Sequence, residues 1–114
     1  MKVIIAGSRT FNDYKTLKEV CDHMLSNSTD IEIVSGTARG ADLLGEQYAK
    51  ERGYPIKQFI PDWDGLGKKA GYVRNEEMAK YSDALIAFTN GSKGTQHMIN
   101  LANQYGLKIE VYKF

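Results

Sequence analysis

The stretch IEIVSGTARGADLLGEQYAKERG, residues 31 to 53, contains a complete strand, turn and helix. Residues 31 to 34 are a short run rich in β-branched side chains, which is typical of a buried strand. We predict a helix from residue 38 to residue 52, because four apolar side chains recur on one of its faces: Ala41, Leu44, Tyr48 and Ala49. Gly53 is expected to end that helix.

The same alternation of strand and helix continues along the chain. Short apolar runs predict four more strands, at residues 2 to 6, 56 to 60, 83 to 88 and 108 to 113. Helical periodicity predicts further helices at residues 12 to 25, 69 to 81 and 95 to 105. Strands separated by helices need crossover connections, which favour parallel pairing. We therefore predict an α/β fold: a single Rossmann-like, doubly wound, mainly parallel five-stranded sheet with helices on both faces.

Length, charge and cysteine content narrow the class of protein. With 114 residues, the chain is expected to form one domain, residues 1 to 114. Its 15 Lys and Arg are nearly balanced by 14 Asp and Glu, so we do not expect nucleic acid as a partner. The apolar runs are too short to span a bilayer, no signal segment precedes the first strand, and one cysteine cannot form an internal disulfide. We expect a cytoplasmic protein without membrane contacts.

The loops that follow the first four predicted strands carry the residues that an anion site needs. They read GSRT (7 to 10), SGTARGAD (35 to 42), PDWDGLGKKAG (61 to 71) and TNGSKGT (89 to 95). The carboxyl ends of parallel strands meet at one edge of the sheet, where glycines, hydroxyl groups and helix N-termini can hold phosphate. The candidate ligand-binding residues in these loops are Gly7, Ser8, Arg9, Gly36, Thr37, Arg39, Lys68, Gly91, Lys93, Gly94 and Thr95.

Two common phosphate-binding motifs are absent from the sequence. There is no G-x-x-x-x-G-K-[ST] loop and no G-x-G-x-x-G fingerprint after the first strand, which disfavours standard kinase and dehydrogenase functions. No cysteine or carboxylate set lies at a spacing suited to a metal ion, so we predict no metal site and no cofactor.

One arginine and one tryptophan are further candidates for contact with a ligand. Arg74, with its neighbour Asn75, is expected where the start of the third predicted helix faces the cleft, and its guanidinium can clamp a phosphate. The alternative for Arg74 is a surface ion pair with Glu76 or Glu77. Trp63 lies in a polar loop, where it either stacks on a base or plugs the edge of the sheet.

Two carboxylates and a histidine complete the set of candidates. Asp42 and Glu46 lie four residues apart on one helix face, so either can hold a ribose hydroxyl, orient Arg39 or belong to a solvated surface. His97 is in the first turn of the last helix and can touch a ligand as a neutral donor or as a cation.

Four motifs are distributed along nearly the whole chain: VIIAGSRTF at the start, SGTARGAD, DWDGLGKKAGYVRNEEM, and GTQH after the fourth strand. Together they resemble the small YspA-type branch of the SLOG superfamily of nucleotide-binding domains. The resemblance implies a Rossmann-like domain that senses or processes a nucleotide or an ADP-ribose-like ligand. It also implies a homo-oligomer.

The segment RNEEMAKYSDALIAFTNGSKGT, residues 74 to 95, is similar to part of the LOG phosphoribohydrolases. Arg74 takes the place of that family's catalytic Arg, and its P-G-G-x-G-T-x-x-E signature is matched by Gly91, Gly94 and Thr95. Asn90 replaces the Pro of the signature, Ser92 its second Gly and Met98 its Glu. A thioether cannot stabilise the oxocarbenium-like state of N-glycosidic cleavage, so we favour binding over catalysis.

Three hypotheses remain from the sequence. In the first, a nucleotide ligand is cradled by Gly7/Ser8, Gly36/Thr37 and the Gly94/Thr95 helix start, with Arg74 neutralising its phosphate. In the second, the chain is an N-glycosidase or nucleotide hydrolase that uses Asp42 or Glu46 in place of the lost Glu. The third is single-stranded DNA binding, because SGTARGAD is similar to a loop of the DprA group, which has Ile in place of Ala41.

Overall fold

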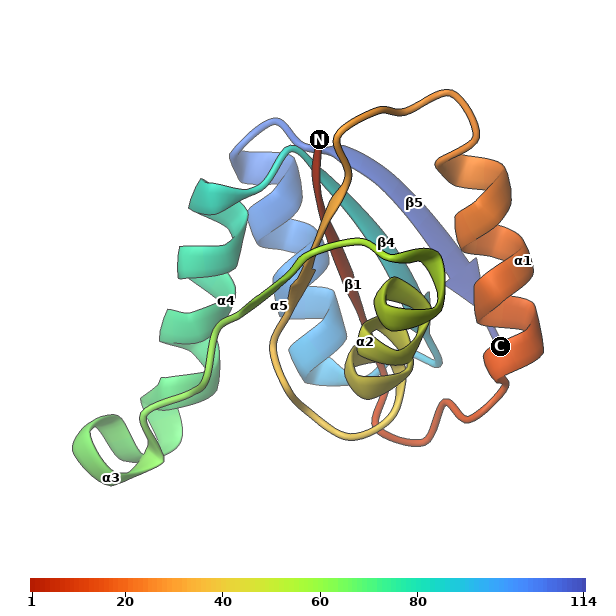
Figure 1. Cartoon of the computed structure of the whole chain (residues 1–114). Coiled ribbons are helices and arrows are strands. Elements are labelled where there is room, and N and C mark those ends of the chain that lie inside the picture. Colours follow the sequence, from red (N-terminus) through yellow and green to blue (C-terminus); the bar gives the residue numbers. More distant parts are fainter.

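Five parallel strands form one sheet in the order β3-β2-β1-β4-β5 in the computed structural model, which describes residues 1–114 (Figure 1). The strands are β1 (Lys2–Gly7), β2 (Glu32–Ser35), β3 (Ile56–Gln58), β4 (Ala84–Thr89) and β5 (Lys108–Lys113). The predicted Rossmann-like fold is confirmed, and the sheet is wholly rather than mainly parallel.

Helices cover both faces of the sheet (Figure 1). They are α1 (Tyr14–Met24), α2 (Ala41–Arg52), α4 (Ala70–Tyr81) and α5 (Lys93–Gln104). Val3 and Ile5 of β1 point to the core formed with α1 and α2, whereas Ile4 points to the core formed with α4 and α5. Because its two faces are buried, β1 is a continuous apolar run rather than an alternating one. None of the helices combines the length and the apolar character that crossing a bilayer requires.

The strand order reverses between β1 and β4, which places a crevice at their carboxyl ends. The two strands run in register, with Gly7 opposite Phe88, and the N–H of Ser8 donates to the carbonyl of Phe88 over 2.9 Å. A Cβ atom at position 7 would lie 2.1 Å from that carbonyl oxygen. Glycine is therefore required for the close approach of β1 to β4 that shapes the crevice.

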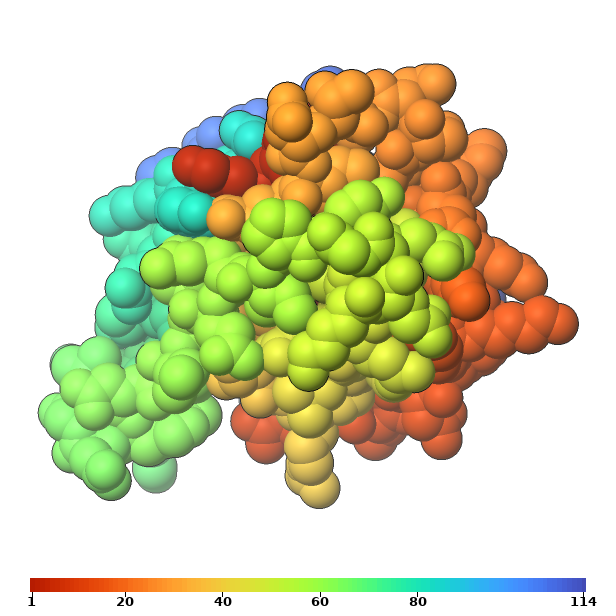
Figure 2. All heavy atoms as spheres, viewed as in Figure 1, coloured from red at the N-terminus to blue at the C-terminus, as the bar shows by residue number.

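One element was not predicted from the sequence. Residues 61 to 68 were expected to form a polar loop, but they contain the short helix α3 (Trp63–Leu66), followed by the 3-10 turn η1 (Gly67–Lys69). The Asp62 carboxylate caps α3 by accepting from the N–H of Gly65 over 2.9 Å. This segment, coloured green, projects from the body of the molecule at the lower left (Figure 2). A four-residue helix is too short for helical periodicity to reveal.

Element ends differ from the predictions by a few residues. The first helix starts at Tyr14 rather than residue 12, because Asp13 caps it by accepting from the N–H of Thr16 over 3.1 Å. The last helix starts at Lys93, two residues earlier than expected, and β3 ends at Gln58 rather than residue 60.

Candidate functional site

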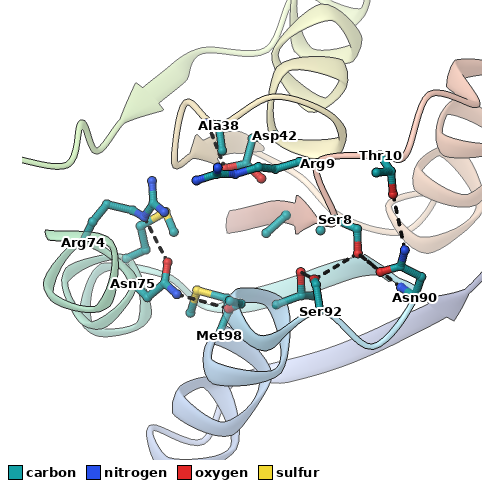
Figure 3. Close-up of a pocket in the computed structure, with 15 residues that line it drawn as sticks. Ser8, Arg9, Thr10, Ala38, Asp42, Arg74, Asn75, Asn90, Ser92 and Met98 are labelled. Carbon is teal, nitrogen blue, oxygen red and sulfur yellow. Dashed lines mark hydrogen bonds between the residues drawn. The ribbon is translucent and has the colours of Figure 1, made fainter. Parts of the chain in front are cut away.

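A cavity of about 350 Å³ opens at the carboxyl ends of β1 and β4 (Figure 3). Three of the four predicted loops line it, together with the first turn of α2, the middle of α4 and Met98 of α5. Eight of the predicted site residues lie on its wall: Gly7, Ser8, Arg9, Asp42, Arg74, Asn75, Gly94 and Thr95. The structure thus places side chains from distant parts of the chain around one space.

Hydroxyl and amide groups join the loops after β1 and β4 on one side of the cavity. The Ser8 hydroxyl donates to Asn90 Oδ1 over 2.7 Å and lies 3.0 Å from the Ser92 hydroxyl. The Ser92 hydroxyl is also 2.9 Å from that of Thr95, on the first turn of α5. Asn90 Nδ2 donates to the Thr10 hydroxyl over 3.3 Å. This cluster fixes the start of α5 against the end of β1.

The N-terminus of α5 offers free hydrogen-bond donors beside this cluster. Ser92 is the N-cap residue, but its side chain caps no backbone N–H group. The N–H groups of Lys93, Gly94 and Thr95 have no acceptor within the chain. A Cβ atom built at Gly94 would meet no atom within 4 Å, so the backbone is open at this point. Unsatisfied N–H groups and the helix dipole together favour an anion here.

Arg74 is held on the opposite side of the cavity (Figure 3). One of its terminal nitrogens donates to the carbonyl of Gly36, and its Nε donates to Asn75 Oδ1 over 3.0 Å. The alternative of an ion pair with a neighbouring glutamate is not realised, since Glu76 pairs with Lys80 over 3.2 Å. Burial lowers the pKa of Arg74, and the proximity of Asp42 opposes that effect. The guanidinium is oriented but carries no partner carboxylate.

Asp42 is a buried carboxylate on the cavity wall, with 5% of its surface exposed. Burial raises its pKa to about 6, although Arg74 and the N–H of Ala38 act in the opposite direction. A Cβ atom at Gly36 would lie 2.7 Å from Asp42 Oδ2 and 2.8 Å from the nearest Arg74 nitrogen. The two groups are therefore neighbours, but no ion pair within 4.0 Å forms between them.

His97 does not line the cavity but supports a residue that does. Its Nδ1 lies 3.1 Å from Nδ2 of Asn75, which also donates to the Gly94 carbonyl over 3.4 Å. Asn75 accepts from Arg74 at the other end of its amide. Burial lowers the pKa of His97, which favours its neutral form. The amide of Asn75 thus links Arg74 on α4 to the start of α5.

Glu46 lies outside the cavity, although it was a candidate catalytic residue. Its carboxylate accepts from the Ser35 hydroxyl over 2.7 Å and from Gln58 Nε2 over 3.0 Å. Ser35 in turn accepts from the N–H of Thr37 over 3.1 Å. In this structure Glu46 braces the loop after β2 and lines neither of the cavities at this edge of the sheet.

A second cavity of about 200 Å³ lies beside the first and shares Arg9, Ala38 and Arg74 with it. Four further predicted residues line it: Gly36, Thr37, Arg39 and Trp63. Four others line neither cavity, namely Lys68, Gly91, Lys93 and His97. The predicted ligand-binding set is therefore divided between two adjoining spaces.

Several wall residues were not among the candidates. Thr10, Asn90, Ser92 and Met98 all line the larger cavity, and Met98 is only 1% exposed. Asn90, Ser92 and Met98 are the positions at which the sequence departs from the phosphoribohydrolase signature. Those departures were a signal for the site, because all three positions line the cavity.

The family model of the YspA, cpYpsA-related SLOG family matches residues 1–65, more than half of the chain. The chain belongs to this family. Its relatives include the Gene 61 protein of Mycobacterium phage D29, which is 33% identical over 116 residues that cover 95% of this chain and 93% of the phage protein. The resemblance seen in the sequence motifs is confirmed.

Solved structures share the fold of this SLOG domain at low sequence identity. DNA processing protein A (DprA) from Streptococcus pneumoniae superposes with a TM-score of 0.79 at 20% identity over 96% of this chain. The protein TM1055 superposes with a TM-score of 0.70 at 18% identity, over 95% of this chain and 71% of its own. DprA from Helicobacter pylori superposes with a TM-score of 0.72 at 21% identity, over 97% of this chain and 64% of that protein. That structure concerns a single-stranded DNA binding mode.

The domain spans about half of the Streptococcus protein, 49% of its length. Since one of these proteins of like fold binds single-stranded DNA, the fold does not support our expectation that nucleic acid is disfavoured as a partner. The predicted homo-oligomer stays a prediction.

Proposed function

We propose that this domain binds a nucleotide or an ADP-ribose-like molecule through its phosphate, at the carboxyl edge of the sheet. One observation carries the proposal: a single cavity joins the unsatisfied start of α5 to an oriented guanidinium without a carboxylate partner. Arginines held in this way on a concave surface are suited to bidentate contacts with phosphate.

In this proposal the two sides of the cavity make different contacts with the phosphate. The N–H groups of Gly94 and Thr95 and the hydroxyl of Ser92 donate to the phosphate oxygens. Arg74 supplies the compensating charge from the opposite side, and Arg9 lines the same cavity (Figure 3). Neither Arg9 nor Arg74 takes part in any of the three ion pairs of the structure. Both are available to an anionic ligand.

The wall of the cavity favours binding without cleavage. Met98 lies on the wall at the position where the phosphoribohydrolase signature carries Glu. A thioether provides no negative charge to stabilise a developing positive charge on the ribose. The domain is thus suited to sense or sequester a nucleotide, or to deliver it to a partner.

Thermal unfolding in the presence of candidate ligands tests the proposal. A ligand at 100 times its dissociation constant stabilises the folded state by about 2.7 kcal/mol. We expect nucleoside monophosphates, nucleoside diphosphates or ADP-ribose to raise the melting temperature of the wild type more than that of Arg74→Ala. If none of these ligands raises the melting temperature of the wild type, the proposal is contradicted.

The second candidate function is hydrolysis of the nucleotide, and Asp42 is the observation that favours it. A carboxyl group on the cavity wall with a pKa of about 6 can exchange protons near neutral pH. Incubation with adenosine 5'-monophosphate distinguishes the two functions. Release of free adenine by the wild type, abolished in Asp42→Asn, would establish the hydrolase and displace the binding module.

A third candidate is single-stranded DNA binding, which the fold shared with the two DprA proteins favours. Binding through several phosphates would weaken steeply with salt, because each neutralised phosphate releases counterions. A mononucleotide held by one phosphate would show a much shallower dependence. The salt dependence of oligonucleotide and mononucleotide affinity therefore separates these functions.

A further inference from the structure

The smaller cavity adjoins the phosphate site and has a different chemical character. It is lined by Trp63 and by the loop after β2, including Thr37 and Arg39, and it shares Arg9 and Arg74 with the larger cavity. A ligand with its phosphate at the start of α5 can therefore extend past Arg74 into this second space. The first cavity offers hydroxyl and N–H donors, whereas the second offers an aromatic ring.

Trp63 presents that ring without using it to fill the core. It is 52% exposed, and none of the aromatic pairs in the structure includes it. One edge of its indole rests against α4, where a Cβ atom at Gly71 would lie 3.6 Å away. The alternative that Trp63 plugs the edge of the sheet is not realised. An exposed indole at a concave site is suited to stacking on a planar ring.

The loop after β2, which lines the second cavity, contains one residue in a strained backbone conformation. Thr37 has a φ angle of +66°, which is rare for a β-branched residue and costs energy unless the surroundings impose it. The Ser35 hydroxyl, which donates to Glu46, accepts from the N–H of Thr37 and so holds this residue in place. Strain of this kind is concentrated at ligand sites. The loop that Glu46 braces also carries Arg39, so these hydrogen bonds help to position Arg39 at the second cavity.

We propose that the second cavity binds the base of the ligand, stacked on Trp63 and flanked by Arg39. The inference rests on the proposed phosphate site and makes it more specific. The ligand class is then a nucleotide with an intact base, and sugar phosphates without a base bind more weakly. Arg74, which belongs to both cavities, lies between the phosphate and the base.

The chain contains one tryptophan, so its fluorescence reports on this cavity directly. Adenosine 5'-monophosphate and ribose 5-phosphate are the two probes, because they share the phosphate and the ribose and differ in the base. We expect the nucleotide to bind about ten- to a hundredfold more tightly, the range for stacking of one base on an aromatic side chain. Only the nucleotide should change the emission of Trp63.

Two variants and a control complete the test. Trp63→Ala should weaken nucleotide binding to the level of ribose 5-phosphate and leave ribose 5-phosphate unaffected, whereas Trp63→Phe should retain most of the preference for the base. Tyr105→Ala removes an aromatic ring that is 38% exposed and lies just beyond the far end of α5, so it should change neither affinity. Calorimetry measures all four proteins, and thermal unfolding checks that each is folded.

The outcomes separate this inference from the proposed phosphate site. If both probes bind equally to the wild type, or if Trp63→Ala leaves the preference for the nucleotide intact, the base site is wrong and the phosphate site stands. If neither probe binds the wild type at millimolar concentration, the phosphate site and the base site both fail.

Discussion

Replacement of Asp42 by Asn should alter the pH dependence of folding stability in a defined direction. The carboxyl group is buried on the cavity wall, and Arg74 is near it without forming an ion pair. Burial raises its pKa from the ordinary value of 3.8 to about 6. The folded state therefore holds the proton of Asp42 at pH values where the unfolded chain has already released it.

The sign and the size follow from that difference in pKa. A group whose pKa is raised in the folded state contributes stability that is present below pH 3.8 and lost as the pH rises through 6. Because one pKa unit corresponds to about 1.4 kcal/mol, the ionised carboxylate reduces the free energy of unfolding by about 3 kcal/mol at neutral pH. Asparagine does not ionise, so the free energy of unfolding of the variant should not fall in this way as the pH rises.

Urea unfolding of wild type and Asp42→Asn between pH 4 and pH 7.5 measures the effect. The difference in unfolding free energy should move in favour of the variant by about 2.4 kcal/mol across this range, since part of the effect already occurs below pH 4. Other titrating groups cancel in the difference, and a constant offset from altered hydrogen bonds does not affect the trend. A difference that is independent of pH would refute the reasoning that Asp42 is ionised in a desolvated site.

Three further substitutions and one spectroscopic measurement test the site. Arg74→Ala should weaken nucleotide binding by about ten- to a hundredfold in calorimetry, the range for a charge-assisted hydrogen bond, with the fold intact. Gly94→Val should abolish binding but hardly change the melting temperature, since its side chain enters open space at the cavity; lost stability with binding retained would mark a structural turn instead. Met98→Glu should destabilise the domain and weaken phosphate binding, whereas Met98→Leu should do neither; a stable Glu variant with unchanged affinity would place residue 98 outside the site. Nitrogen NMR should find neutral His97 protonated on Nε2, because its Nδ1 accepts from Asn75; a proton on Nδ1 would contradict the link to Arg74.

The fold could be predicted from the sequence because its elements have strong and regular patterns. β1 is a continuous apolar run because both of its faces are buried, and α1 and α2 each have one apolar face because they pack on the sheet with that face. The glycine-rich loops were expected at one edge, and the parallel topology brings them there. Helix α3 escaped prediction, because its start depends on a single cap by Asp62.

The candidate site was only partly predictable, because sequence spacing does not show which way a side chain points. Asp42 and Glu46 lie on one helix face, yet Asp42 faces the cavity and Glu46 turns to Ser35. The role of His97 as a support for Asn75 depends on a contact between α4 and α5 that no local pattern encodes. Such contacts arise from tertiary packing and require the structure.

Calorimetric titration of the wild type and Arg74→Ala with adenosine 5'-monophosphate tests whether this cavity binds phosphate. We predict saturable binding to the wild type and an affinity about ten- to a hundredfold lower for the variant, because Arg74 supplies the charge that the phosphate requires. The same affinity in both proteins, or the absence of binding to the folded wild type at millimolar nucleotide, would contradict the claim that this cavity is a phosphate site.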